Sequence, residues 1–186
     1  MSRIFYTADT HFNHEFVAGT RNYESAEAHD EDLIARFNRE VTKRDHLWIL
    51  GDLCMGSLTE GLKQASRLNG IKHLVLGNHD AGHPMHKKSH NYMRRYMEVF
   101  ESVHLHEQHI IDDHKVSLSH FPYRGDHKPD DRHVQWRLRD EGLPILHGHV
   151  HGEWLLDGSQ LNVGVDHGMM PVHRDTVGYW LKELAE

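Results

Sequence analysis

The sequence predicts a single α/β domain that spans residues 1–186. Two observations indicate this fold class. Strand and helix signals alternate through the first half of the chain, which is typical of parallel strands with helices packed outside them. The chain has 186 residues, 38% of them apolar, and contains no internal repeat or low-complexity linker. This length and composition suit one hydrophobic core.

The elements of the first half follow from the spacing of apolar residues. Short apolar runs predict strands, and the helical spacing of Leu33, Phe37 and Val41 predicts an amphipathic helix. Asn69-Gly70 is a typical helix stop. The expected elements are a strand at 4–8, a helix at 27–41, a strand at 46–50, a helix at 58–68 and a strand at 72–76.

The second half contains more turn signals. Asp112-Asp113-His114 predicts a turn, and Asp157-Gly158 between two apolar runs is a strong hairpin signal. We expect a helix at 92–100, strands at 103–111, 115–119, 144–146, 154–156 and 160–165, and a C-terminal helix at 177–184.

Composition restricts the compartment and the partners. The net charge of −7 argues against a protein that coats nucleic acid, because nonspecific binding depends on cationic side chains. The single Cys54 excludes an internal disulfide and suits a reducing compartment. No apolar run is long enough to span a bilayer, and the chain enters its first strand without a signal-type segment. We therefore expect a cytoplasmic protein without a membrane partner.

Five short polar motifs follow apolar runs, at the points where strands are expected to end. Most of these motifs are weak signals alone, since Asp, Asn and Gly also form turns, but the alternate histidines of residues 148–151 are a stronger signal, because alternate residues of an extended segment point the same way. In open α/β sheets, however, the carboxyl ends of strands meet at one edge, where ligands bind. The motifs are Asp9-Thr10-His11, Gly51-Asp52, Gly77-Asn78-His79-Asp80, His120 and Gly148-His149-Val150-His151.

These motifs supply imidazole and oxygen ligands without an obligatory thiolate. Such a set suits Mn, Fe, Zn or Ni better than Ca or Mg, and we expect Mn. The candidate ligands are Asp9, His11, Asp52, Asn78, His120, His149 and His151. Seven groups are too many for one catalytic metal with an open position, and they suit two metals that share a carboxylate.

The order of the motifs resembles the calcineurin-like metallophosphoesterase superfamily, whose pattern is D-x-H, G-D, G-N-H-[DE], a lone H and G-H-x-H. The chain matches every block between residues 9 and 151. The segments Asp9–His14, His120–Tyr123 and Asn162–Asp166 also resemble a small phage and bacterial branch of these phosphoesterases. The resemblance implies a four-layer sandwich of two mixed β-sheets flanked by helices, with a dimetal site at the C-terminal edge of the strands.

The resemblance also implies a role for each motif. One metal would be held by Asp9, His11, Asp52 and His151, and the other by Asp52, Asn78, His120 and His149, with Asp52 as the bridge. His79 would protonate the leaving oxygen, and Asp80 would orient His79. Asp80 is a local departure, since many relatives have Glu there.

The expected activity is hydrolysis of a phosphodiester by a metal-bridging hydroxide, with His79 as general acid. A cyclic or other small nucleotide is the expected substrate, and an extended nucleic acid is disfavoured by the charge. A nuclease, a phosphomonoesterase or protein phosphatase, a nucleotide pyrophosphatase and a non-catalytic metal-binding scaffold remain alternatives. Neither the oligomeric state nor the physiological substrate follows from the sequence.

Weaker signals mark further residues near the motifs. His14, Tyr123 and Arg124 are candidate substrate contacts. A surface position explains His14 equally well, and a solvated loop charge is the favoured interpretation of Arg124. Asn162 and Asp166 are candidates for bracing the site through hydrogen bonds. A basic group after the Asn78-His79 motif could approach a nucleotide or form a solvated helix face; it consists of Lys87, Lys88, Arg94 and Arg95.

Overall fold

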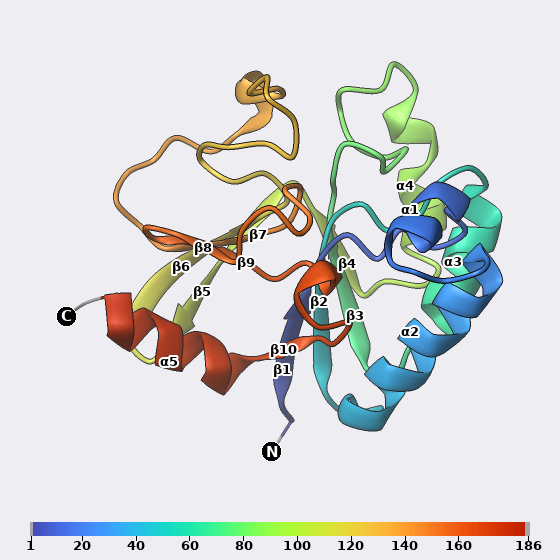
Figure 1. Cartoon of the computed structure of the whole chain (residues 1–186), viewed down its shortest axis with the longest axis horizontal. Helices are drawn as coiled ribbons and strands as arrows, with labels where there is room; N and C mark the ends of the chain where they lie inside the picture. Colours follow the sequence, from blue (N-terminus) through green and yellow to red (C-terminus); the bar gives the residue numbers. More distant parts are fainter. Residues whose placement is uncertain (1, 185–186) are drawn as a thin grey trace.

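The computed structural model describes residues 2–184, in which two five-stranded sheets pack against each other with helices beside them (Figure 1). Both sheets contain parallel and antiparallel pairs. This is the predicted α/β architecture of two mixed sheets flanked by helices. None of the helices within residues 2–184 is long and apolar enough to cross a membrane.

The first sheet has the strand order β10-β1-β2-β3-β4. Its strands are β1 (Ile4–Thr7), β2 (His46–Leu50), β3 (Ile71–Val75), β4 (Ser102–His104) and β10 (Val172–His173). Strands β1 to β4 run parallel, and β10 pairs antiparallel with the outer side of β1. The second sheet has the order β5-β6-β7-β9-β8. Its strands are β5 (His106–Ile111), β6 (His114–Ser119), β7 (Ile145–His147), β8 (Leu156–Asp157) and β9 (Gln160–Asn162).

Two helices cover the outer face of the first sheet. These are α2 (Ala26–Glu40) and α3 (Leu58–Ser66), which are capped by Ser25 and Ser57, whose side chains accept hydrogen bonds from backbone amides of the first turn. Their apolar faces bury Leu33, Phe37 and Leu62 against the sheet. The remaining helices are α1 (Glu15–Thr20), α4 (Met93–Tyr96), α5 (Arg174–Leu184) and the 3₁₀ turns Ser89–Asn91, Val134–Trp136 and Val165–His167.

A second apolar core lies between the sheets. Tyr6, Trp48 and Val75 of the first sheet belong to the same buried cluster as Val116 and Leu146 of the second. Helix α5 adds Val177 and Leu181 to this cluster and contacts β1, β5 and β10. The alternate residues of β1 and β2 therefore face two different cores, which explains why both strands read as continuous apolar runs.

Several element boundaries differ from the expectations. The strand expected at 103–111 is two strands, because the chain leaves the first sheet after His104 and enters the second at His106. The helix expected at 92–100 is limited to Met93–Tyr96 and continues as turns. Helix α1 and strand β10 were not predicted, and both are short.

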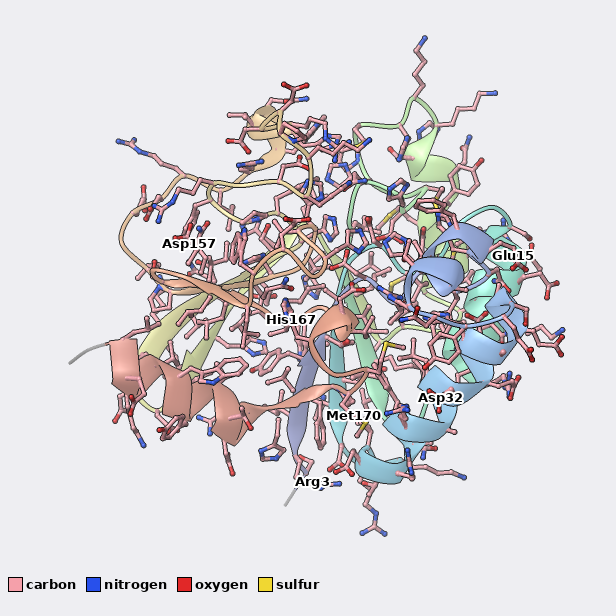
Figure 2. All side chains as sticks on the ribbon, in the orientation of Figure 1. Arg3, Glu15, Asp32, Asp157, His167 and Met170 are labelled. Carbon is pink, nitrogen blue, oxygen red and sulfur yellow. The ribbon has the colours of Figure 1, made fainter. Side chains whose placement is uncertain are left out.

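The strands that precede the five motifs end at the same edge of the molecule. Strands β1, β2 and β3 of the first sheet, and β6 and β7 of the second, run into the loops that carry these motifs. Figure 2 shows Arg3 at the opposite end, where β1 begins and where its side chain pairs with Asp45. The candidate site is thus built where both sheets end.

Candidate metal centre

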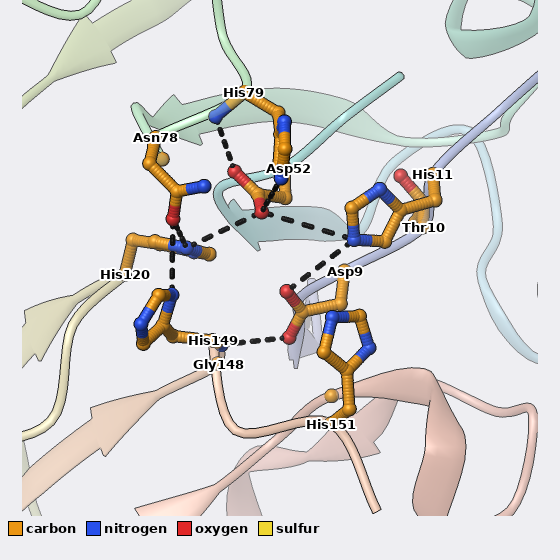
Figure 3. Close-up of polar contacts among 12 residues, drawn as sticks. Asp9, Thr10, His11, Asp52, Asn78, His79, His120, Gly148, His149 and His151 are labelled. Carbon is orange, nitrogen blue, oxygen red and sulfur yellow. Dashed lines mark hydrogen bonds and ion pairs between the residues drawn. The ribbon is translucent and has the colours of Figure 1, made fainter. Parts of the chain in front are cut away.

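All seven predicted ligands lie together at this edge (Figure 3). Asp9 and His11 follow β1, Asp52 follows β2 and Asn78 follows β3. His120 and the His149–His151 segment follow β6 and β7 of the other sheet. The site therefore spans the junction between the two sheets.

One half of the site contains Asp9, His11 and His151. Single ligand atoms of these residues lie within 4.8 Å of one another. His11 Nε2 is 3.9 Å from Asp9 Oδ1 and 3.7 Å from Asp52 Oδ2. Neither ring nitrogen of His11 has a hydrogen-bond partner among the described residues, and neither does Asp9 Oδ1. Buried polar atoms are rarely left unpaired, so these atoms fit a bound cation.

The other half of the site brings three acceptor atoms together. Asn78 Oδ1 is 3.1 Å from His120 Nε2 and 3.0 Å from His149 Nδ1. The other ring nitrogens are occupied as donors, since His120 Nδ1–H donates to the Leu50 carbonyl at 2.9 Å and His149 Nε2–H donates to Asp126 at 3.1 Å. A carbonyl and a carboxylate only accept hydrogen bonds.

The hydrogen bonds to Leu50 and Asp126 therefore fix the tautomers of both neutral rings. The unprotonated His120 Nε2 and His149 Nδ1 both point toward the Asn78 oxygen. Burial lowers the pKa of His120 and of His149, which keeps both rings neutral. Three lone pairs directed at one point repel each other unless a cation lies among them.

Asp52 lies between the two halves. Its Oδ2 is 3.7 Å from His11 Nε2 and 3.5 Å from His120 Nε2, while its Oδ1 accepts a hydrogen bond of 2.8 Å from the His79 amide. Burial raises the pKa of Asp52, and it raises the pKa of Asp9 to about 6. Buried carboxylates of this kind are stabilised in their charged form by a nearby cation. Buried Asp and His side chains that can hold metal ions are therefore present on both sides of Asp52.

His79 and Asp80 have different surroundings. The His79 ring is partly exposed, and its Nε2 lies 3.9 Å from Asp52 Oδ2. Asp80 is buried, and its carboxylate accepts hydrogen bonds from the amides of Asp52, Leu53 and Gly77. No hydrogen bond between the Asp80 carboxylate and the His79 ring is present within residues 2–184, so a role for Asp80 in orienting His79 stays a prediction. Asp80 ties the loop after β2 to the loop after β3.

The backbone at the site is unusual. Asp9, His11, Asp52, His149 and His151 all have positive φ, between 46° and 72°. Such conformations are uncommon for residues other than glycine and collect at functional sites. Gly148 allows a close approach here, since a Cβ at this position would lie 2.5 Å from the Ala8 Cβ.

Hydrogen bonds from outside the site hold His151 in place. His151 Nδ1 is 3.2 Å from Asp166 Oδ2, and Arg21 donates two hydrogen bonds of 2.8 Å to Asp166. Asn162 donates to the His151 carbonyl at 2.7 Å. The proposed bracing by Asn162 and Asp166 therefore has a structural basis.

Two supporting residues, Arg21 and Asp126, were missed by sequence reasoning. Arg21 lies in a short connection between α1 and α2, and Asp126 lies in a polar loop. Neither belongs to a motif, so no local signal marks them. Asp126 has a fully buried carboxylate, which pairs with Arg132 as well as with His149.

The three candidate substrate contacts lie in different surroundings. His14 lies beside His11, with ring centroids 5.6 Å apart, and its Nδ1 also accepts a hydrogen bond from Val17 at the start of α1. Arg124 is 61% exposed and pairs with Asp157 of the β8–β9 hairpin. Tyr123 lines a hollow with Ser117 and Leu138. The structure therefore places only His14 next to the predicted ligands.

Comparisons with solved structures support the fold. A protein of unknown function from Aquifex aeolicus, AQ665, aligns with 97% of this chain and 100% of its own, with a TM-score of 0.72 and 22% identity. An archaeal phosphodiesterase aligns with 87% of this chain and 82% of its own, with 19% identity and a TM-score of 0.45, which is too low to establish a common fold. No family model matches the sequence.

Relatives by sequence include two phage proteins. The gene 66 protein of Mycobacterium phage L5 is 39% identical over 193 residues, which cover 95% of this chain and 93% of that protein. The gene 66 protein of Mycobacterium phage D29 is 37% identical over 200 residues, which cover 100% of this chain and 99% of that protein. The uncharacterized protein MJ1445 of Methanocaldococcus jannaschii is 31% identical over 84 residues, 43% of this chain and 48% of its own. The chain belongs to the family of the mycobacteriophage gene 66 proteins.

Proposed function

We propose that this protein is a dimetal phosphodiesterase that hydrolyses a small nucleotide-type phosphodiester. The observation that carries the proposal is the convergence of Asn78 Oδ1, His120 Nε2 and His149 Nδ1, three acceptors with no donor among them. The His11 ring, whose nitrogens have no hydrogen-bond partner within residues 2–184, and the buried Asp9 carboxylate support a second ion on the other side of Asp52. Asp52 would contact both.

Nitrogen and oxygen ligands of this kind favour a transition metal, and we propose Mn. Two bound divalent ions would supply an activated water and neutralise charge on the phosphoryl oxygens. The residues of the chain would position these ions across the junction of the sheets. His79 is an exposed acid–base group beside Asp52, so we propose that it is the general acid that protonates the leaving oxygen.

The first experiment measures metal content and hydrolysis together. The purified protein is loaded with Mn, and bound metal is counted while hydrolysis of bis(p-nitrophenyl) phosphate is followed with and without chelator. We expect about two ions per chain and turnover that requires them. Metal binding without turnover on any phosphodiester or phosphomonoester would instead support a non-catalytic scaffold.

A variant of the bridging residue tests the arrangement. Asp52→Asn should lower the occupancy of both ions, because Asp52 Oδ2 faces both halves of the site. Asp157→Asn is the matched control, since Asp157 is partly exposed on the β8–β9 hairpin and pairs with Arg124. Full occupancy of two ions in Asp52→Asn would contradict the assignment of Asp52 as the bridge.

A further inference from the structure

A hollow of ≈ 400 Å³ adjoins the candidate site on the side of His79. Its lining consists of His79, Ala81, His86, Lys87, Lys88 and Tyr92. We call it the lysine hollow. Its volume is in the range of small-molecule sites, and Tyr92 adds an aromatic ring of the kind on which bases stack.

The lysine segment is held against the site by hydrogen bonds. His86 Nε2–H donates to the Asn78 carbonyl at 2.9 Å, within the motif that supplies both a predicted ligand and His79. Backbone hydrogen bonds run from His83 to Asp80 and from His86 to His83, at 2.9 and 3.0 Å. These hydrogen bonds therefore fix the backbone that carries Lys87 and Lys88 relative to His79.

The charge of the lysine hollow is not compensated by its own lining. The lining contains two lysines and no acidic residue. Neither lysine forms an ion pair with a carboxylate within residues 2–184. A second hollow of ≈ 380 Å³ adjoins the site on the side of His151, and Glu153 and Asp166 line it. Asp166 of this second hollow is already paired with Arg21, whereas the two lysines on the His79 side have no carboxylate partner among the described residues. An anionic group is therefore favoured on the His79 side.

We infer that the lysine hollow binds the leaving group of the substrate and that this leaving group carries a phosphate of its own. The inference rests on the proposed phosphodiesterase function. A group that protonates the leaving oxygen must lie beside it, so the hollow lined by His79 is the one that receives the leaving group. Lys87 and Lys88 would then contact its additional phosphate, which favours a linear nucleotide substrate over a cyclic one.

The reaction can be written for a 5′-phosphorylated deoxydinucleotide. Water adds to the internal phosphorus, the bond between phosphorus and the 3′ oxygen breaks, and that oxygen takes a proton from His79. The products are two deoxynucleoside 5′-monophosphates, one of which is the leaving group. The same dinucleotide without its 5′-phosphate yields a nucleoside as the leaving group, so the pair of substrates differs only in the group assigned to the lysines.

The test compares kcat/KM for these two dinucleotides in the Mn-loaded protein. We expect a preference of about tenfold or more for the 5′-phosphorylated substrate, as for a charge-assisted contact. Lys87→Glu/Lys88→Glu should remove most of this preference, and Lys87→Arg/Lys88→Arg should retain it. Lys43→Glu/Lys115→Glu has the same change in net charge and should keep the preference. Lys43 precedes β2 and Lys115 is the second residue of β6, so both lie away from the carboxyl ends of the strands, where the candidate site is.

A binding measurement gives a readout without turnover. Titration of the metal-free protein with deoxyadenosine 5′-monophosphate should show binding that weakens about tenfold in Lys87→Glu/Lys88→Glu and not in the Lys43/Lys115 control. Equal hydrolysis of both dinucleotides by the wild type would overturn the inference and leave the proposed function in place. Absence of metal-dependent hydrolysis of any phosphodiester would overturn the proposed function itself.

Discussion

At the scale of single residues, the hydrogen bond at one nitrogen of each imidazole decides what the other nitrogen can do. His120 donates to the Leu50 carbonyl, and His149 donates to Asp126, so the free nitrogen of each ring faces Asn78. His151 Nδ1 lies 3.2 Å from Asp166 Oδ2, so a hydrogen bond to Asp166 can orient this ring in the same way. Partners of this type orient metal-binding histidines and raise their basicity.

The assignment of His79 as the acid leads to a dependence on the leaving group. His79→Ala should leave the metal content unchanged, because no predicted ligand depends on the His79 ring. Hydrolysis of diesters with poor leaving groups should fall by about 10²–10⁴-fold, the usual contribution of a general acid. Hydrolysis of nitrophenyl esters should fall much less, since their leaving oxygen hardly needs a proton. Equal losses on both kinds of ester would remove His79 from this role.

Asp126 is expected to act through His149. Asp126→Asn leaves a side chain of similar size but weakens the acceptor that fixes the His149 tautomer. We expect the affinity for one of the two metals to fall by about 10–100-fold. Competition with a chelating dye measures this affinity, and Asp130→Asn, an exposed change in the same loop, is the control. An unchanged affinity would limit Asp126 to its ion pair with Arg132.

The seven candidate ligands could be predicted because each follows a recognisable apolar run within a short motif. Arg21 and Asp126 could not, since their importance depends on contacts with residues far away in the chain: Arg21 with Asp166, and Asp126 with His149. Arg124 shows why position beside a motif is a weak signal. It adjoins a motif in sequence, but its side chain turns to Asp157.

At the scale of elements, local patterns identified the long helices and the parallel strands, and they failed where tertiary structure decides. The apolar residues from Val103 to Ile111 look like one strand, and nothing local shows that the chain changes sheets at Leu105. Strand β10 has two residues and exists only because β1 offers it a free edge. Pairing of this kind depends on the assembled sheet, so a short stretch of sequence does not predict it.

The contact between the ends of β7 and β1 is also an element-scale feature that can be tested. Gly148→Ala would place a methyl group 2.5 Å from the Ala8 Cβ, so the two strand ends must separate. Overpacking of this kind costs about 1–3 kcal/mol, and here it also displaces Asp9. Denaturant unfolding and metal titration measure the two effects. Gly19→Ala is the control, because a Cβ at Gly19 meets nothing within 4 Å.

At the scale of the whole molecule, the proposed ions would connect the two sheets. Asp9, His11, Asp52 and Asn78 follow strands of the first sheet, whereas His120, His149 and His151 follow strands of the second. A ligand that binds only the folded state stabilises it by about 2.7 kcal/mol at a concentration 100 times its Kd. We expect Mn to raise the thermal midpoint and a chelator to lower it. A midpoint that does not respond to Mn would contradict binding at this junction.

Acid sensitivity should arise from a second group of histidines, in the layer between the sheets. His73 stacks on Trp48, with ring centroids 4.4 Å apart, and it hydrogen-bonds to His46 and Ser102. His109 packs edge to face against Trp48, with ring centroids 4.6 Å apart. Burial lowers the pKa of His73 from 6.5 to about 4, with smaller contributions from His46, His104 and His109. Protonation of His73 therefore opposes folding.

The sign of the pH dependence follows from this shift. Between about pH 6.5 and pH 4 the unfolded chain binds a proton at His73 that the folded chain does not, so stability falls as the pH falls through this window. The expected slope is up to about 1.4 kcal/mol per pH unit for one such proton. His73→Gln should reduce the slope, and His106→Gln, a change at an exposed residue of β5, should not. Urea unfolding with chelator present measures the slope without a contribution from metal release, and identical slopes for wild type and His73→Gln would exclude His73 as its source.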